Sequence, residues 1–208
     1  MSSALIVIDM QRDFCATGGY ADQAGLDIGL LRAPIPAIQR LLASARVRGL
    51  LVLHTREGHR ADLADLPEPK RLRAANAGAA IGSQGPLGKL LVRGEYGHDL
   101  IDELQPLPGE PVIDKPGYSA FASTDLDLLL RNRGITELII CGVTTEVCVS
   151  STLRSAVDRG YACTLVSDAC GSAYPELHAA ALAMVDVEGG LFGRVCDSRR
   201  LVDEWEGR

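Results

Sequence analysis

A cysteine, an aspartate and a lysine each follow a short apolar run that is typical of a buried strand. Asp9 ends the run ALIVID, Lys115 comes just after the run PVI, and Cys148 lies a few residues after the run LIICGV. Because ligands of parallel sheets bind where strands end, we expect these three side chains to meet at one edge of a sheet. A thiol can then act as a nucleophile, with the carboxylate accepting its proton and the ammonium group balancing the charge.

Cys148 is the candidate nucleophile because of where the next helix is expected to begin. The sequence predicts a helix start near Thr145 or Glu146, which places Cys148 in the first turn, where free backbone N–H groups and the helix dipole favour an anion. A thiol in such a position can have its pKa lowered, and the thiolate is the reactive form. The alternative is that Cys148 is one more small buried side chain, since free cysteine is among the most buried residue types.

Strand and helix patterns alternate along the chain and predict the scaffold for these residues. Apolar runs predict strands at residues 4–9, 50–55, 111–113, 138–143, 162–166 and 191–195. Helical spacing and end signals predict helices at residues 35–45, 124–131, 146–159 and 176–187. Such alternation favours parallel strand pairs joined by right-handed crossovers. We therefore predict a single three-layer α/β/α domain over residues 1–208, with a mostly parallel, Rossmann-like sheet.

Residues 57–110 interrupt this alternation. They are rich in proline, glycine and charged residues, and only residues 100–104 carry a short helical pattern. We predict that this segment is an excursion that decorates the edge of the sheet.

Composition and charge narrow the class of protein and its partners. The chain has 208 residues, of which 47% are hydrophobic and 23% charged, as in ordinary folded domains. Its formal net charge is -6 and it has no basic run, which argues against binding to nucleic acid or to an anionic membrane. The 6 cysteines form no C-x-x-C pair, which is typical of a reducing compartment. Asp9 interrupts the first apolar run far short of the ~20 residues of a membrane helix, so we expect a cytoplasmic protein.

Three segments of the chain resemble the catalytic segments of the isochorismatase-like cysteine hydrolases. They read ALIVIDMQRDF, IDKP and CGVTTEVC, and the resemblance extends over residues 4–198. It implies an isochorismatase-like hydrolase fold in which Asp9, Lys115 and Cys148 are the catalytic residues. Relatives are commonly dimers or tetramers, so the resemblance also implies a homo-oligomer.

The resemblance implies further features around the nucleophile. The peptide bond between Val143 and Thr144 is expected to be cis, and the amides of Thr144 and Cys148 are expected to form an oxyanion hole. Asp9 would take the thiol proton, and the attack would leave a thioester-like acyl-enzyme that water hydrolyses. Lys115 would keep the carboxylate and the thiolate ionised together.

Within this family the chain is most similar to biuret and triuret hydrolases, which cleave small urea-derived amides. The similarity is carried by the stretch HTREGHRADLADLP and by the short segments GE and DKPG. Nicotinamidases of the same superfamily hold a metal through an Asp-x-His pattern after the second strand. The sequence TREG at residues 55–58 lacks that pattern, so we expect neither a metal nor any other cofactor.

One departure from the biuret hydrolases concerns the substrate. Their pattern has a glutamine before the Gly-Gly-x-Phe-Gly segment, where this chain has Glu188. A carboxylate only accepts hydrogen bonds, so Glu188 would suit a donor-rich or cationic ureido or guanidino substrate such as guanylurea. Alternatively, Glu188 faces solvent at a helix end. Phe14 and Phe121 are candidates for the pocket wall, although core packing explains them nearly as well.

Several functions remain open at this point. The substrate could be guanylurea, biuret, triuret or another carbamoyl compound such as ureidoacrylate or N-carbamoylsarcosine. A rival of a different class is a catalytically silent α/β binding module that has kept the fold, because function lies in the site and not in the fold.

Overall fold

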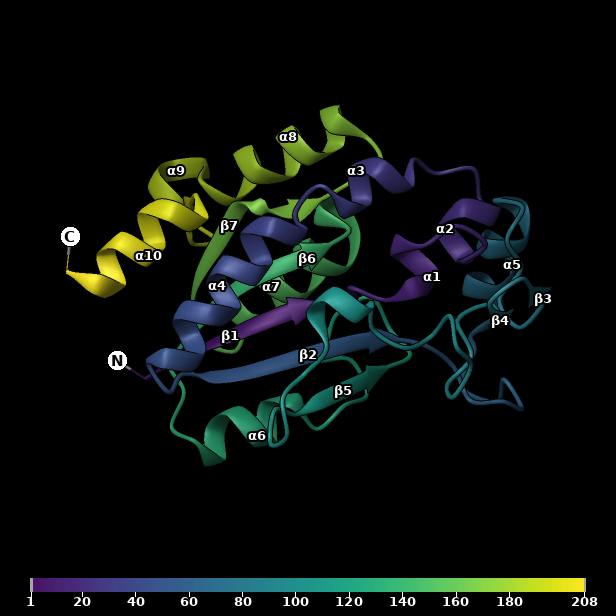
Figure 1. Ribbon diagram of the computed structural model, residues 1–208, viewed down its shortest axis with the longest axis horizontal. Helices are drawn as coiled ribbons and strands as arrows, with labels where there is room; N and C mark the ends of the chain where they lie inside the picture. The colour runs from purple at the N-terminus through teal and green to yellow at the C-terminus, as the bar shows by residue number, and fades with distance from the viewer. Residues whose placement is uncertain (1, 208) are drawn as a thin grey trace.

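A parallel sheet of six strands forms the centre of the protein (Figure 1). The computed structural model describes residues 2–207. The strand order is β5-β2-β1-β6-β7-β8, and each neighbouring pair is parallel. The strands are β1 (Ser3–Ile8), β2 (Leu51–Glu57), β5 (Val112–Lys115), β6 (Glu137–Val143), β7 (Ala162–Gly171) and β8 (Arg194–Cys196). The predicted α/β fold class is confirmed.

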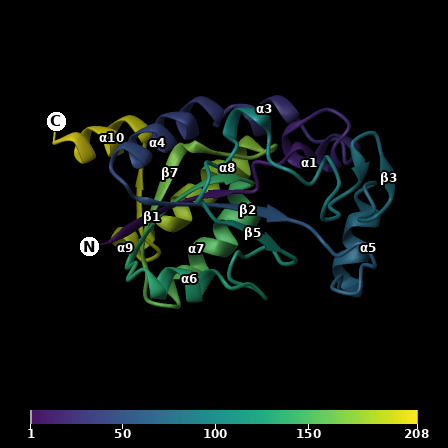
Figure 2. The ribbon, with the colours of Figure 1, turned by 60° about the horizontal axis from the view of Figure 1, so that its bottom comes forward.

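Helices cover both faces of this sheet (Figure 2). On one face lie α4 (Ile35–Val47) and α10 (Ser198–Glu206), and on the other lie α6 (Leu126–Asn132) and α7 (Ser150–Val157). α8 (Pro175–Val185) packs against β7 and is followed by α9 (Val187–Gly190). None of the helices within residues 2–207 combines the length and the hydropathy that crossing a membrane requires.

β1 is one of the two central strands of the sheet, and this position explains why its sequence is apolar without alternation. Every side chain from Ala4 to Ile8 is fully buried, since helices cover both faces of the strand. β1 pairs with β2 on one side and with β6 on the other. The chain moves from β1 to β2 in one direction across the sheet and from β6 to β7 in the opposite direction. Right-handed crossovers then lie on opposite faces, which opens a crevice at the carboxyl ends of β1 and β6.

The excursion at residues 57–110 does not decorate the sheet edge, and that prediction is wrong. Most of it lies beyond the carboxyl ends of the strands, where it contains α5 (Glu68–Asn76) and the hairpin of β3 (Gln84–Gly85) and β4 (Gly88–Lys89) (Figure 1). Residues 102–110 then return alongside α4 to the start of β5. The helical pattern near residue 100 corresponds to the short 3-10 helix η1 (Asp102–Leu104). α5 was missed because it buries only Lys70 and Ala74, so it has no apolar stripe for a sequence pattern to detect.

Other elements also differ from the sequence-based prediction. The last strand begins later than residue 191, because Leu191 is exposed and Gly193 adopts a φ of 135° ahead of β8. Residues 12–32 form three short helices that were not predicted, namely α1 (Arg12–Cys15), α2 (Tyr20–Gln23) and α3 (Ile28–Arg32). α10 was not predicted either.

Gly142 allows β6 to approach β1 next to the site, and its replacement is expected to destabilise the fold. Its φ is 116°, and a Cβ atom there would lie 2.1 Å from the carbonyl oxygen of Ile8. We expect Gly142→Ala to lower the free energy of unfolding by about 3 kcal/mol or more, from backbone strain and overpacking together. Gly49→Ala is the matched control, since Gly49 has a φ of 67° with no atom near the added Cβ. Urea unfolding of both variants measures the difference, and equal losses would contradict the steric argument.

Candidate active site

The segment after β6 presents the candidate nucleophile. The peptide bond between Val143 and Thr144 is cis, as predicted. Residues Thr145–Val149 then form a π-helical turn, η2, in which the Val149 amide donates to the Thr144 carbonyl oxygen at 3.2 Å. α7 continues from this turn, so the predicted helix begins with a wider turn than an ordinary α-helix. Such π-turns are frequent at functional sites, and here the turn carries the buried side chain of Cys148.

Asp9, Lys115 and Cys148 come together at the carboxyl ends of β1, β5 and β6. The Lys115 ammonium nitrogen lies 2.7 Å from Asp9 Oδ2, and both side chains are fully buried. The hydroxyl of Thr55 donates to Asp9 Oδ1 at 2.6 Å, which fixes the orientation of the carboxylate. Asp9 itself adopts a φ of 52°, so the chain turns sharply as it leaves β1. The sequence therefore predicted correctly that these three residues are neighbours.

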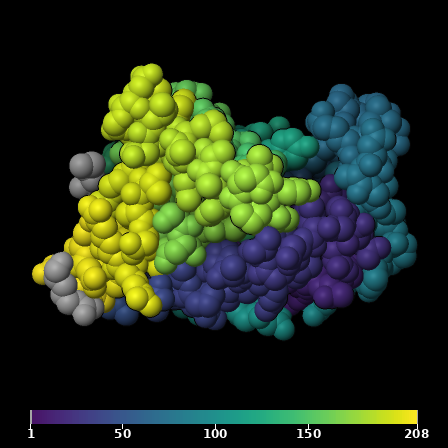
Figure 3. Space-filling view, turned by 90° about the horizontal axis from the view of Figure 1, so that it is seen from above, coloured from purple at the N-terminus to yellow at the C-terminus, as the bar shows by residue number. Residues whose placement is uncertain are grey.

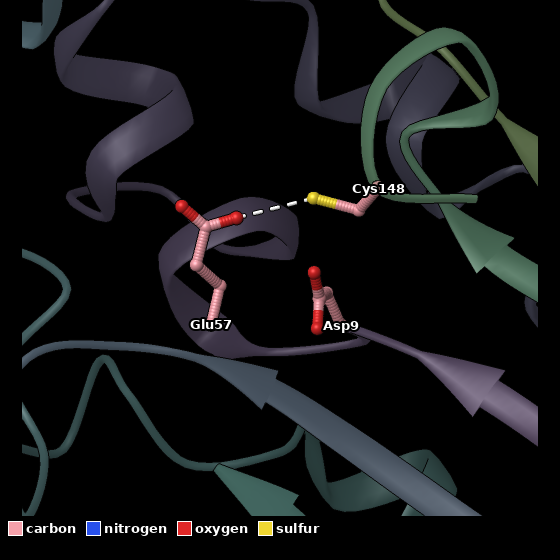
Figure 4. Close-up of side chains that lie close together, drawn as sticks. All are labelled: Asp9, Glu57 and Cys148. Carbon is pink, nitrogen blue, oxygen red and sulfur yellow. Dashed lines mark hydrogen bonds between the residues drawn. The ribbon is translucent and has the colours of Figure 1, made fainter. Parts of the chain in front are cut away.

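Glu57 is a second carboxylate in the site, and sequence reasoning missed it. Cys148 Sγ donates a hydrogen bond to Glu57 Oε2 at 3.1 Å (Figure 4). The Lys115 ammonium nitrogen lies 3.4 Å from the same oxygen, and the Lys70 ammonium nitrogen lies 2.6 Å from Glu57 Oε1. A signal was available, because Glu57 is the last residue of β2 and so shares the strand-end position of the other site residues.

The surroundings shift the pKa values of the two carboxylates and of the thiol in different ways. Burial raises the pKa of Asp9, and the nearby Lys115 ammonium only partly offsets it. Burial alone would also raise the pKa of Glu57, but Lys115 and Lys70 outweigh it and hold that pKa at about 2. Burial raises the pKa of the Cys148 thiol well above its ordinary value. The Lys115 ammonium only partly offsets this rise, and the negative charge of Glu57 adds to it. The expectation of a lowered thiol pKa is therefore wrong, and the resting group is a thiol that donates to Glu57.

The same cluster can be tested as a metal site. A carboxylate oxygen of Asp9, one of Glu57 and the sulfur of Cys148 lie within 4.8 Å of one another. However, the ammonium groups of Lys70 and Lys115 already contact these carboxylates. A divalent cation would lie next to two positive charges, so these residues do not fit a metal ion.

A cavity of about 480 Å³ opens above this cluster. Cys148, Glu57 and Thr144 line its base, and the aromatic rings of Phe14 and Tyr20 are part of its wall. The other lining residues are Ala24, Leu26, Lys70, Arg73, Ala74, Ala77, Ile81, Leu91, Tyr118, Glu146, Val147 and Tyr174. The volume suits a small-molecule substrate, and Phe14 lies where the sequence placed it.

Phe121 and Glu188 do not line this cavity. Phe121 is buried in the core, where its ring stacks on that of Tyr161 at 5.9 Å, so the packing alternative holds for this residue. Glu188 has an exposed side chain in α9. The segments containing α9 and α5 lie at opposite ends of the molecule (Figure 3). The reason is topological, because the connection from α8 to the parallel strand β8 must lie at the amino ends of the strands, away from the site.

Glu146 is a cavity residue that the sequence analysis did not single out. Its carboxylate lines the cavity two residues before the candidate nucleophile. Among the described residues 2–207, no group donates a hydrogen bond to its buried Oε2 atom. A substrate with N–H donors could supply the missing partner.

Comparison with known proteins identifies relatives across almost the whole chain. The family model described as the isochorismatase domain matches residues 3–200. An isochorismatase family protein from Desulfovibrio vulgaris is 32% identical with a TM-score of 0.80, and the match covers 100% of this chain and 99% of that one. A cysteine hydrolase from Pseudomonas syringae is 28% identical with a TM-score of 0.83, over 99% and 92% of the two chains. A pyrazinamidase/nicotinamidase from Streptococcus mutans is 28% identical with a TM-score of 0.75, over 94% and 100%.

Proposed function

The chain belongs to the isochorismatase family of hydrolases, and from this premise we propose that it is a cysteine amidohydrolase acting on small carbamoyl or amide compounds. The observation that carries the proposal is the position of the Cys148 thiol. It lies at the base of a cavity and is surrounded by Asp9, Glu57 and Lys115. This is the set of groups that nucleophilic attack on a carbonyl carbon, followed by proton transfer to nitrogen, requires.

In the proposed reaction Asp9 carries the proton between sulfur and nitrogen. As the Cys148 sulfur attacks the carbonyl carbon, the thiol proton passes to Asp9 Oδ2, whose only described polar contact is the ion pair with Lys115. Asp9 then gives this proton to the departing nitrogen as the C–N bond breaks, which releases ammonia and leaves a thioester. Water attacks the thioester, Asp9 takes its proton, and that proton returns to the sulfur as the acid product leaves. The raised pKa of Asp9 suits a group that must hold a proton for part of the cycle.

The amides of Thr144 and Cys148 are the proposed donors to the oxyanion. Both residues line the cavity. Thr144 is the second residue of the cis peptide bond, and Cys148 lies on the turn that follows it. In comparable sites the loss of one such donor costs about 3 to 4 kcal/mol of transition-state stabilisation.

For the substrate we propose a ureido or guanidino compound of the biuret type, such as guanylurea, biuret or triuret. The support is the likeness of residues 54–67 to biuret hydrolases and the unfilled Glu146 Oε2, which favours a molecule rich in N–H donors. Glu188 no longer supports this choice. The second candidate is a carbamoyl compound with a carboxylate, such as ureidoacrylate or N-carbamoylsarcosine, which the cavity residue Arg73 favours.

The test of the function is ammonia release by the purified protein. The panel comprises biuret, triuret, guanylurea, ureidoacrylate, N-carbamoylsarcosine and nicotinamide. Ammonia release from at least one ureido compound is the expected result. A protein that binds members of the panel but releases no ammonia from any of them would be the silent binding module instead.

Glu146→Gln is expected to change substrate preference. The neutral amide of glutamine can donate as well as accept, so it should lose the preference of a carboxylate for a cationic or donor-rich group. We expect the ratio of kcat/KM for guanylurea to that for biuret to fall by about 10-fold. Glu188→Gln removes the same charge from an exposed position outside the cavity and should leave the ratio unchanged. A ratio that responds to position 188 and not to position 146 would contradict this assignment.

A further inference from the structure

Glu57 differs from the other cavity residues because three groups fix its carboxylate. Its Oε1 lies 2.6 Å from the Lys70 ammonium nitrogen, and its Oε2 lies 3.4 Å from that of Lys115. The same Oε2 accepts the thiol hydrogen of Cys148 at 3.1 Å. Only 3% of the residue is exposed, so water does not screen these contacts. Two adjacent ammonium groups favour the ionised form of this carboxylate and hold its pKa at about 2.

The backbone of Glu57 is also held in place. The side-chain oxygen of Gln11 accepts a hydrogen bond from the Glu57 amide at 2.6 Å, and the Gln11 side-chain nitrogen donates to the Glu57 carbonyl oxygen at 3.0 Å. Gln11 is fully buried and follows β1, so the ends of β1 and β2 are tied to each other through Glu57. The carboxylate therefore has a fixed position relative to Cys148 before any substrate arrives.

Attachment of α5 to the sheet explains the position of only one of the two carboxylate oxygens of Glu57. Lys70 comes from α5, donates to the Pro116 carbonyl oxygen at 2.7 Å and lies 5.0 Å from the centre of the Tyr118 ring. Its contact with Glu57 Oε1 attaches α5 to the sheet. Oε2 is not needed for this attachment, and it faces the thiol at the base of the cavity.

The two carboxylates of the site have opposite surroundings. Asp9 has one ammonium neighbour and a raised pKa, whereas Glu57 has two and a pKa of about 2. Where the surroundings shift the pKa values of two carboxylates in opposite directions, one carboxylate is suited to carry a proton and the other to remain an anion. Asp9 takes the first role in the proposed mechanism, which leaves the second for Glu57.

We propose that Glu57 is a substrate-binding residue that orients the thiol before the reaction and then accepts a hydrogen bond from an N–H group on the attacked carbon. This inference rests on the amidohydrolase function proposed above. Once the thiol proton has passed to Asp9 and the S–C bond has formed, Glu57 Oε2 has lost its thiol donor and keeps only the 3.4 Å contact with Lys115, so it can receive the substrate N–H. Glu57 gains and loses no proton, because the proton that reaches the leaving nitrogen comes from Asp9. The substrate class is therefore an unsubstituted amide or carbamoyl group, in preference to an ester that has no N–H.

The first experiment needs no substrate and measures the contact with the thiol. Iodoacetamide labelling of Cys148, followed by mass spectrometry, is recorded against pH for the wild type, Glu57→Gln and Arg71→Gln. Arg71 is the control because it lies on the exposed side of α5, where it pairs with Glu68. We expect Glu57→Gln to lower the labelling midpoint by at least one pH unit, because the carboxylate that retains the thiol proton has become neutral. An unchanged midpoint would overturn the assigned contact, whether or not the protein is an amidohydrolase.

The second experiment measures the contact with the substrate nitrogen. The kcat/KM values of a primary amide and of the methyl ester of the same acid are compared in the wild type and in Glu57→Gln. Because the effect of Glu57 on the thiol is common to both substrates, the ratio of the amide value to the ester value isolates the contact with nitrogen, and we expect this ratio to fall by about 10- to 100-fold. An equal loss for both would show that Glu57 acts on the thiol alone and would overturn the substrate contact. If Glu57→Gln does not fold, Glu57→Asp takes its place in this experiment. Glu57→Asp keeps the charge but moves the carboxylate away from the substrate nitrogen, and it should show the same amide-selective loss.

Discussion

Cys148→Ala is expected to abolish ammonia release, with a fall in kcat of about 10⁴-fold or more. The variant keeps the cavity, the oxyanion donors and both carboxylates, but no atom remains that can form the acyl intermediate. The measurement is ammonia release from the best substrate of the panel, with circular dichroism to show that the fold is retained. A small loss would mean that water attacks the substrate directly and that no thioester forms.

Two further variants separate the nucleophile from the other thiols. Cys148→Ser keeps a donor to Glu57 Oε2 but offers a hydroxyl, whose proton is much harder to remove, so it should be almost as inactive. Cys196→Ala removes a thiol on β8, at the sheet edge opposite β5, and should keep full activity.

A trapped thioester adds the mass of the acyl group to the peptide that contains residue 148. Its appearance on any other cysteine would refute the assignment.

The sequence could place Asp9, Lys115 and Cys148 together because strand ends are readable features. Continuous apolar runs identify buried parallel strands, and such strands carry their functional residues at one edge of the sheet. The positions of these residues follow from local patterns plus one general rule of topology. Their distances, 2.7 Å between Lys115 and Asp9 among them, required the structure.

Lys70 and the protonation of the thiol could not be predicted in the same way. Lys70 lies on α5, a helix with two buried positions and no apolar periodicity, inside a segment that the sequence presents as irregular. Its partner Glu57 was visible at a strand end, but its effect depends on two lysines that are 45 residues apart in sequence. The helix start alone suggested an ionised thiol, whereas burial and the adjacent carboxylate favour the neutral form.

Glu188 shows how topology can overrule a motif. The residue was singled out from its place before a glycine-rich segment, which carries no information about which end of the sheet it occupies. In a parallel sheet the chain returns from α8 to the amino end of β8, and Glu188 lies on that return. The strand order was needed to assign it to the far side.

Lys115→Met is expected to cost both stability and activity. The ammonium group of Lys115 lies between the carboxylates of Asp9 and Glu57. Among the described residues, no other cationic side chain forms an ion pair with Asp9. Its removal leaves a fully buried carboxylate unpaired, which typically lowers the free energy of unfolding by about 3 to 5 kcal/mol. Asp9 then avoids the charge by binding a proton, so it no longer accepts the thiol proton, and kcat should fall by about 10²- to 10⁴-fold.

The pH dependence of this loss has a definite sign. In Lys115→Met the pKa of Asp9 is raised further in the folded chain, whereas in the unfolded chain it stays at its ordinary value. The folded state then binds the proton more tightly, so the destabilisation is complete at high pH and shrinks as the pH falls towards the ordinary carboxyl pKa. Urea unfolding at several pH values measures it, and a loss that grows as the pH falls would contradict the argument.

The double variant Asp9→Asn/Lys115→Met separates the charge effect from loss of packing. With both charges gone, no unpaired ion remains next to β1, so most of the stability lost in Lys115→Met should return. Activity should not return, because asparagine cannot accept the thiol proton. Recovery of stability without activity would show that Lys115 stabilises the fold through the ionised form of Asp9, the form that the reaction uses. If the double variant is as unstable as Lys115→Met, the loss comes from the missing contacts of the lysine chain, and the ion pair is not what holds the ends of β1 and β5 together.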